Sequence, residues 1–107
     1  MKIVVVKPGK PAKIRDIDGS LESMQKVVGG YIECLNPWGN NICLICNEEG
    51  KIQGLKPNRS ITNKNGARDI IAGTFFFCRS KGEEFAGFSD AGASYIASLF
   101  KEVPKWE

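Results

Sequence analysis

The stretch Gly54–Phe77, GLKPNRSITNKNGARDIIAGTFFF, decides how the chain is organised. Its second part, from Asp69 onward, is the most strand-like run in the sequence, and we predict a long central strand at residues 70–79. Its first part, residues 54–68, has no acidic side chain. A polar loop therefore leads into a rigid strand, which is a common setting for binding residues. The basic side chains of this loop are Lys56, Arg59, Lys64 and Arg68.

The composition indicates one ordinary globular domain over residues 1–107, with 42% apolar and 25% charged residues. The net charge is only +3, but the segment 54–68 carries +4, so the rest of the chain sums to −1. The distribution of charge along the chain is therefore more informative about possible binding partners than the total charge. If a second basic cluster meets the first in space, the two form one positive face; otherwise each is a solvated loop. This second cluster is Lys2, Lys7, Lys10, Lys13 and Arg15.

The absence of histidine excludes whole classes of chemistry. Ser-His-Asp and Cys-His nucleophiles are impossible, and the commonest zinc ligand is missing. The sequence also has no phosphate loop, no dinucleotide fingerprint and no paired carboxylates at a recognisable spacing. We therefore expect a non-enzymatic protein without a cofactor or a bound metal.

The localisation expected from the sequence is cytoplasmic, in the host cell if the protein is encoded by a phage. No apolar run approaches the roughly 20 residues that span a bilayer. The run at residues 3–6 is too short for the core of a signal peptide. The four cysteines are then expected to be reduced.

The predicted fold is α+β, with a mostly antiparallel, twisted sheet of six to seven strands and two helices on one face. Ser20 is the expected N-cap of the first helix, which ends at Gly29-Gly30. Ser89 or Asp90 begins the second helix, which ends before Pro104. The strands are expected at residues 2–6, 12–17, 31–35, 41–46, 51–54, 70–79 and 84–88.

Two motifs resemble functional sites, a metal-binding or redox cysteine pair and a base-stacking aromatic run, but both are better explained as parts of the core. Cys43 and Cys46 match C-x-x-C, yet they lie in a predicted strand, where residues three apart point to opposite faces. Free cysteine is also among the most buried residue types, so we favour a core position over a metal site. Phe75-Phe76-Phe77 offers aromatic rings for base stacking, but adjacent strand residues alternate, so these rings are predicted to pack on both sides of a central strand.

The polar loop supplies the candidate ligand-binding residues. We expect Arg59 and Lys64 to contact phosphates, because arginine offers a planar fork of donors and lysine a compact charge. Asn58 and Asp69 would contact polar groups, and Asp69 would alternatively orient Arg59 or Arg68, or cap the strand. The ring of Tyr31 or Trp38 would stack on a base. The alternative, a solvated surface loop, carries equal weight. The full set is Asn58, Arg59, Ser60, Lys64, Arg68, Asp69, Tyr31 and Trp38.

Several short motifs together resemble a family of small bacterial, phage and plasmid proteins known as a domain of unknown function. The resemblance implies a mobile-element context and supplies no catalytic residues. The cysteines depart from the family pattern, which implies that Cys43 and Cys46 are not a shared site. The motifs are Val6–Lys10 (VKPGK), Ile17–Glu22 (IDGSLE), Val28–Glu33 (VGGYIE), Cys46–Lys51 (CNEEGK), Pro57–Arg59 (PNR) and Asp69–Phe75 (DIIAGTF).

Three functional hypotheses follow. The first is a non-enzymatic accessory protein that binds a small anionic, nucleotide-like ligand, in the sense of sequestering a host defence signal, with a pocket completed by oligomerisation. The second is a nucleic-acid-binding accessory protein that uses both basic clusters. The third is a protein–protein inhibitor of a host defence enzyme. The basic surface argues against DNA mimicry, which needs an acidic one.

Overall fold

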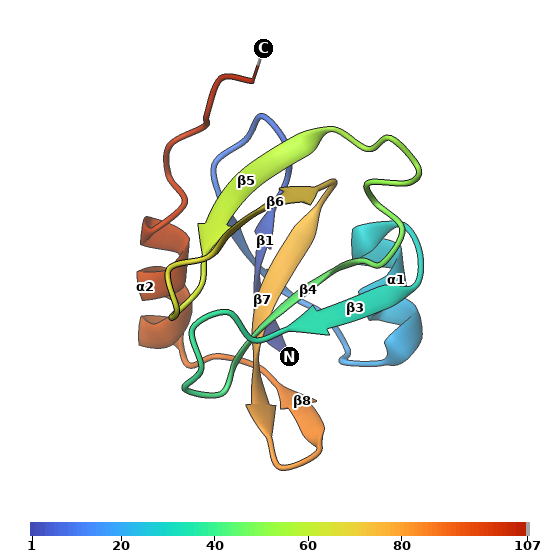
Figure 1. Cartoon of the computed structure of the whole chain (residues 1–107). Coiled ribbons are helices and arrows are strands. Elements are labelled where there is room, and N and C mark those ends of the chain that lie inside the picture. The colour runs from blue at the N-terminus through green and yellow to red at the C-terminus, as the bar shows by residue number, and fades with distance from the viewer. Residues whose placement is uncertain (107) are drawn as a thin grey trace.

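The strand β7, Phe75–Lys81, lies at the centre of a computed structural model that describes residues 1–106 (Figure 1). It pairs antiparallel with β1, Lys2–Val6, on one side and with β4, Ile42–Asn47, on the other. The resulting antiparallel sheet has the order β2-β1-β7-β4-β3, with β8 paired to the end of β7, and the α+β prediction is confirmed. The remaining strands of this sheet are β2 (Lys13–Asp16), β3 (Ile32–Leu35) and β8 (Glu84–Ala86).

Both faces of the main sheet are buried, and one helix covers each. Helix α1, Leu21–Val28, packs with Phe76 on one face. Helix α2, Asp90–Ser98, packs with Phe75 and Phe77 on the other. The phenylalanines therefore alternate as predicted, but the prediction of both helices on one face is wrong. A sheet whose central strands are apolar throughout needs a cover on both sides.

A separate two-stranded sheet replaces the predicted basic loop. Strands β5, Pro57–Thr62, and β6, Arg68–Ala72, form an antiparallel hairpin that lies over the α2 side of the main sheet (Figure 1). Ile61 and Ile71 attach the hairpin to the core there. The predicted long strand is correspondingly broken at Gly73, whose φ of 81° turns the chain from the hairpin into β7.

The prediction of a returning strand at residues 51–54 is wrong. These residues form consecutive turns, in which the Gln53 amide donates to the Glu49 carbonyl at 2.8 Å and the Leu55 amide to the Gly50 carbonyl at 3.0 Å. Residues 1–106 thus contain eight strands where six to seven were expected: the strand at residues 51–54 is lost, while the hairpin adds β5 and divides the long strand into β6 and β7.

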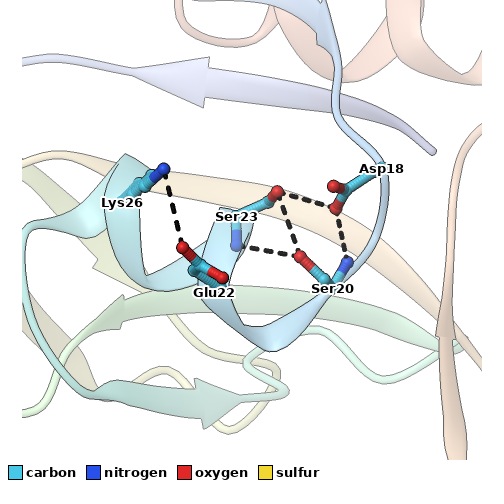
Figure 2. Close-up of polar contacts among 5 residues, drawn as sticks. All are labelled: Asp18, Ser20, Glu22, Ser23 and Lys26. Carbon is cyan, nitrogen blue, oxygen red and sulfur yellow. Dashed lines mark hydrogen bonds and ion pairs between the residues drawn. The ribbon is translucent and has the colours of Figure 1, made fainter.

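Helix α1 begins and ends as its sequence predicts. The Ser20 hydroxyl accepts from the Ser23 amide at 3.1 Å, and Gly29 ends the helix in a left-handed conformation. Figure 2 shows the Asp18 carboxylate beside the N-terminal end of the helix, where it accepts from the Ser20 amide at 2.8 Å and the Ser23 hydroxyl at 2.6 Å. No helix within residues 1–106 has the length and apolar composition needed to cross a membrane.

The Asp18 carboxylate is expected to make stability depend on acidic pH. Its hydrogen bonds from Ser23 and Ser20 lower its pKa from 3.8 to about 2. The charged form is therefore favoured in the folded state, so its contribution is complete above the unfolded pKa and is lost as the pH falls from 3.8 toward 2. The melting temperature of wild type should exceed that of Asp18→Asn at pH 6, and the difference should narrow between pH 4 and 2. A difference that stays constant with pH would contradict this.

Candidate functional site

A cavity of about 310 Å³ lies between the tip of the β5–β6 hairpin and the β3–β4 edge of the main sheet. We call it the inner cavity. Its floor is apolar, because the hairpin residues Ile61 and Ile71 face Leu35 and Leu44 across it. Its rim is polar and comes from the hairpin tip and from the turn after β3. The polar rim residues are Asn36, Asn63, Lys64, Asn65, Arg68 and Asp69.

Hydrogen bonds between distant segments hold this rim in place. The Lys64 amide donates to the Pro37 carbonyl at 2.8 Å, and the Trp38 indole donates to the Thr62 carbonyl at 3.1 Å. Within the tip, the Asn63 side-chain oxygen accepts from two backbone amides, at 2.9 and 3.0 Å. The tip is thus tied both to itself and to the β3–β4 connection, so the rim is largely pre-formed.

The rim has two cations without an acidic partner. Arg68 donates from Nε and Nη2 to the Ser60 hydroxyl, at 3.2 and 3.0 Å, and Lys64 lies at the tip. Within residues 1–106, neither forms an ion pair. The single carboxylate of the rim, Asp69, is paired with Lys51 at 2.6 Å. In the described part of the chain, Lys64 and Arg68 therefore leave positive charge at the rim without an ion-pair partner, although Ser60, to which the Arg68 guanidinium donates, does not itself border the inner cavity.

The sequence suggested that Asp69 could orient Arg59 or Arg68, but in the structure it pairs with a lysine instead. It lies opposite Ile61 in the hairpin register, on the side facing the main sheet, and its partner is Lys51 from the turn after β4. This pairing joins the hairpin to that turn. Because both side chains are more than half exposed, the pair contributes little to stability, on the order of 0–1 kcal/mol.

Asn58 lies in the protein interior and does not border the inner cavity. It is fully buried, and its amide nitrogen donates to the Val6 carbonyl and the Gly73 carbonyl, each at 2.8 Å. These bonds connect β5 to β1 and to the corner between β6 and β7. Both donors of the Asn58 amide are thus used in hydrogen bonds within the protein. The amide could donate to a ligand only if these hydrogen bonds were broken.

Arg59 is also buried, with 5% of its surface exposed, and it lies away from the rim. A register shift between Pro57 and Arg59 explains why two consecutive residues of β5 both face inward, since a bulge interrupts the alternation of a strand. The guanidinium reaches the β1–β2 connection, where Nη2 donates to the Lys10 carbonyl at 2.8 Å. Arg59 therefore does not line the inner cavity, so it cannot serve there as the phosphate contact that the sequence suggested.

The two aromatic candidates do not reach the inner cavity either. Trp38 stacks on Phe77, with ring centroids 5.0 Å apart and planes 16° apart, and acts as part of the core. Tyr31 is 67% exposed and lies after α1, outside the cavity. The structure thus brings together Lys64, Arg68 and Asp69, but places Tyr31 and Trp38 elsewhere.

A second, larger hollow of about 670 Å³ lies on the outer face of the hairpin, and we call it the outer groove. Ser60, Arg68 and Asp69 border it, together with the indole of Trp106. Asn36 at the inner cavity and Trp106 at the outer groove were missed from the sequence. Asn36 lies in a turn motif with no distinctive chemistry, and no local pattern indicates that Trp106 returns to β5.

The two basic clusters meet only at one end of the hairpin. The β1–β2 connection lies beside Lys56 at the start of β5, whereas Lys64 follows the end of β5. A six-residue strand places these ends about 20 Å apart. Lys2 is also paired with Asp16 and Asp90. Of the two arrangements that the sequence left open, the structure therefore shows two separate basic regions and not one positive face.

Cys43 and Cys46 occupy the core positions that were predicted. Cys43 lies on the α1 face and Cys46 on the α2 face, and both are buried. Burial raises the pKa of Cys46 and Cys78 to about 12, so both are protonated thiols at neutral pH. Cys34 is exposed on edge strand β3. Within residues 1–106, no three side chains of a metal-binding type come together.

Comparison with known proteins agrees with the resemblance of the motifs. Neither the curated proteins nor the solved structures gave a match. A family model, however, matches the chain from β1 to beyond α2. The chain therefore belongs to the family described as Domain of unknown function (DUF3846), whose model matches residues 1–101.

Proposed function

We propose that this protein binds a small anionic ligand with an apolar or aromatic part, of the nucleotide type, in the inner cavity, and that it does not transform it. The observation that carries the proposal is the combination of an apolar floor between two sheets with two rim cations, Lys64 and Arg68, that form no ion pair within residues 1–106. Ligand sites are typically concave and mostly apolar, with a few placed polar groups.

Each part of such a ligand has a matching surface. Lys64 and Arg68 would contact the phosphate, and Arg68 still has donors beyond the two that point to Ser60. The floor around Leu44 and Ile61 would cover the base and sugar. The amides of Asn36 and Asn65 on the rim offer both donors and acceptors to the edge of a base. The cavity volume of about 310 Å³ lies at the lower end of the range for ligand sites and suits a mononucleotide better than a larger molecule.

The side chains around the cavity favour retention of a ligand over its conversion. The chain has no histidine, and Asp69 is paired with Lys51, so no poised general base borders the cavity. A protein that holds a nucleotide in this way would sequester a signal, the role expected for an accessory protein of a mobile element.

Calorimetric titration of the protein with AMP tests this proposal, with adenosine and inorganic phosphate as partial ligands. We expect Lys64→Ala and Arg68→Ala each to weaken AMP binding about tenfold, because a hydrogen bond to a charged group contributes about 1.5–3 kcal/mol and tenfold in affinity is about 1.4 kcal/mol. Lys81→Ala and Arg79→Ala remove the same charges from exposed positions on β7 and should leave the affinity unchanged.

The same titrations identify the outcomes that contradict the proposal. Equal weakening by the β7 variants would mean that only net charge matters. Equal affinity for AMP and inorganic phosphate would mean that the apolar floor is not used. An absence of AMP binding would contradict the proposal.

A further inference from the structure

Arg59 carries a buried positive charge whose hydrogen bonds are incomplete. Nη1 donates to the backbone and side-chain oxygens of Asn58, at 3.3 and 3.0 Å, and Nη2 donates to the Lys10 carbonyl at 2.8 Å. A guanidinium has five N–H groups, so at most three have an acceptor and at least two have none. Nε is one of these, with no acceptor among residues 1–106.

No carboxylate compensates this charge within residues 1–106. All three acceptors of Arg59 are neutral, and burial lowers its pKa. The exposed residues nearest along the neighbouring segments are also basic, with Lys10 in the β1–β2 connection and Lys56 before β5. A buried cation in positive surroundings is unfavourable unless an anion accompanies it.

The segment after α2 returns to the backbone of Asn58, the residue before Arg59. The Trp106 indole donates to the Asn58 carbonyl at 3.2 Å, the same oxygen that accepts from Arg59 Nη1. Trp106 and Pro104 also line a hollow of about 450 Å³ together with Gly9 and Lys56, but Arg59 itself does not line this hollow. Trp106 is nevertheless 40% exposed and lies beyond residue 101, where the family match ends. Trp106 is thus a peripheral side chain that one hydrogen bond joins to the backbone beside Arg59.

We propose that Arg59 is the base of a second binding site, which takes an oxyanion of the phosphate type, and that Trp106 covers this site. The unpaired Nε–H and the remaining Nη2–H provide donors for two oxyanion oxygens, while positive charge is added by Lys56, which lines the hollow, and by the exposed Lys10, whose carbonyl already accepts from Arg59. This site is separate from the inner cavity, because Arg59 and Lys56 do not border that cavity. Movement of Trp106 would open it without disturbing the buried sheet.

The arginine Nε–H signal in ¹H–¹⁵N NMR spectra of the full chain tests the site directly, with inorganic phosphate as the probe. The signal of Arg59, assigned by its loss in Arg59→Lys, should shift on titration. Trp106→Ala should bind phosphate about tenfold more tightly, because a site open in about a tenth of molecules loses tenfold in apparent affinity. Arg59→Lys in the Trp106→Ala background should lose the binding, since lysine lacks the fork of donors.

Several outcomes would overturn this inference. An Arg59 signal that phosphate leaves unchanged in both wild type and Trp106→Ala would remove the site. Equal phosphate affinity in these two proteins would remove the covering role of Trp106. The variants Lys64→Ala and Arg68→Ala should retain the Arg59 response, so failure at the inner cavity and failure here are distinguishable. If Arg59→Lys does not fold, as judged by its spectrum, sequential assignment of the Arg59 signal in Trp106→Ala replaces it.

Discussion

Asn58→Ala is expected to lower the free energy of unfolding by about 4 kcal/mol, since it leaves two buried carbonyls without a donor, at about 1–3 kcal/mol each. These are the carbonyls of Val6 and Gly73, which the Asn58 amide joins across 52 and 15 residues of chain. The substitution also removes the Oδ1 acceptor of Arg59. Since these bonds attach the hairpin to the main sheet, the loss should also loosen the inner cavity.

Urea unfolding followed by circular dichroism measures this effect. Asn65→Ala is the matched control, because Asn65 is exposed at the hairpin tip and its substitution should change stability by no more than about 0.5 kcal/mol. Amide hydrogen exchange should further show loss of protection in β5 and β6 before the main sheet opens. A loss below 1 kcal/mol for Asn58→Ala would mean that Asn58 does not hold the hairpin as described.

Phe77→Ala is expected to destabilise the protein by about 3–5 kcal/mol, the usual cost of truncating a fully buried aromatic residue. Phe77 lies in the central strand and contacts three other aromatic rings. It stacks on Trp38 at 5.0 Å, meets Phe75 edge to face at 5.6 Å, and lies 5.2 Å from Phe100. The truncation therefore leaves a cavity between the sheet, the segment after α2 and the turn that supports the hairpin tip.

The fluorescence of Trp38 provides a second measurement besides urea unfolding, because the indole would lose its stacking partner. Tyr95→Ala is the control: this ring is 65% exposed on α2, so its loss should cost no more than about 0.5 kcal/mol. If both variants had similar stability, the aromatic cluster would not be the core of the α2 face.

Much of the fold could be predicted from local chemistry. The run of phenylalanines identified β7 as the central strand, and the caps Ser20 and Ser89 gave the starts of both helices. The C-x-x-C cysteines were correctly assigned to opposite faces of one strand. These features succeed because strand alternation and helix capping depend only on nearby residues.

The hairpin could not be predicted, because its evidence is not local. Strand β5 begins with Pro57 and contains Asn58 and Arg59, residue types that normally indicate a loop. They are buried only because β1 and the β1–β2 connection supply acceptors more than 45 residues away. The opposite placement of the helices also depends on the whole sheet, since it follows from burial on both faces.

The candidate site was predicted in part for the same reason. Lys64 and Arg68 were identified from the charge of the segment, and both do border a cavity. Asn58 and Arg59 were placed at the ligand because a basic, polar tetrapeptide looks like a surface loop. Their burial in a bulged strand, and the position of Trp38 in the core, depend on contacts with residues far away in the chain, which local sequence patterns do not reveal.

The most direct test of the central claim, that the inner cavity binds an anionic nucleotide, is to map its position by titrating ¹⁵N-labelled protein with AMP. The account predicts that the largest changes in amide chemical shift occur at Leu35, Asn36 and residues 63–68, on the two sides of the cavity. Smaller changes are expected at Lys81, at the far end of β7. Changes confined to the surroundings of Trp106, or no change at millimolar AMP, would contradict the account.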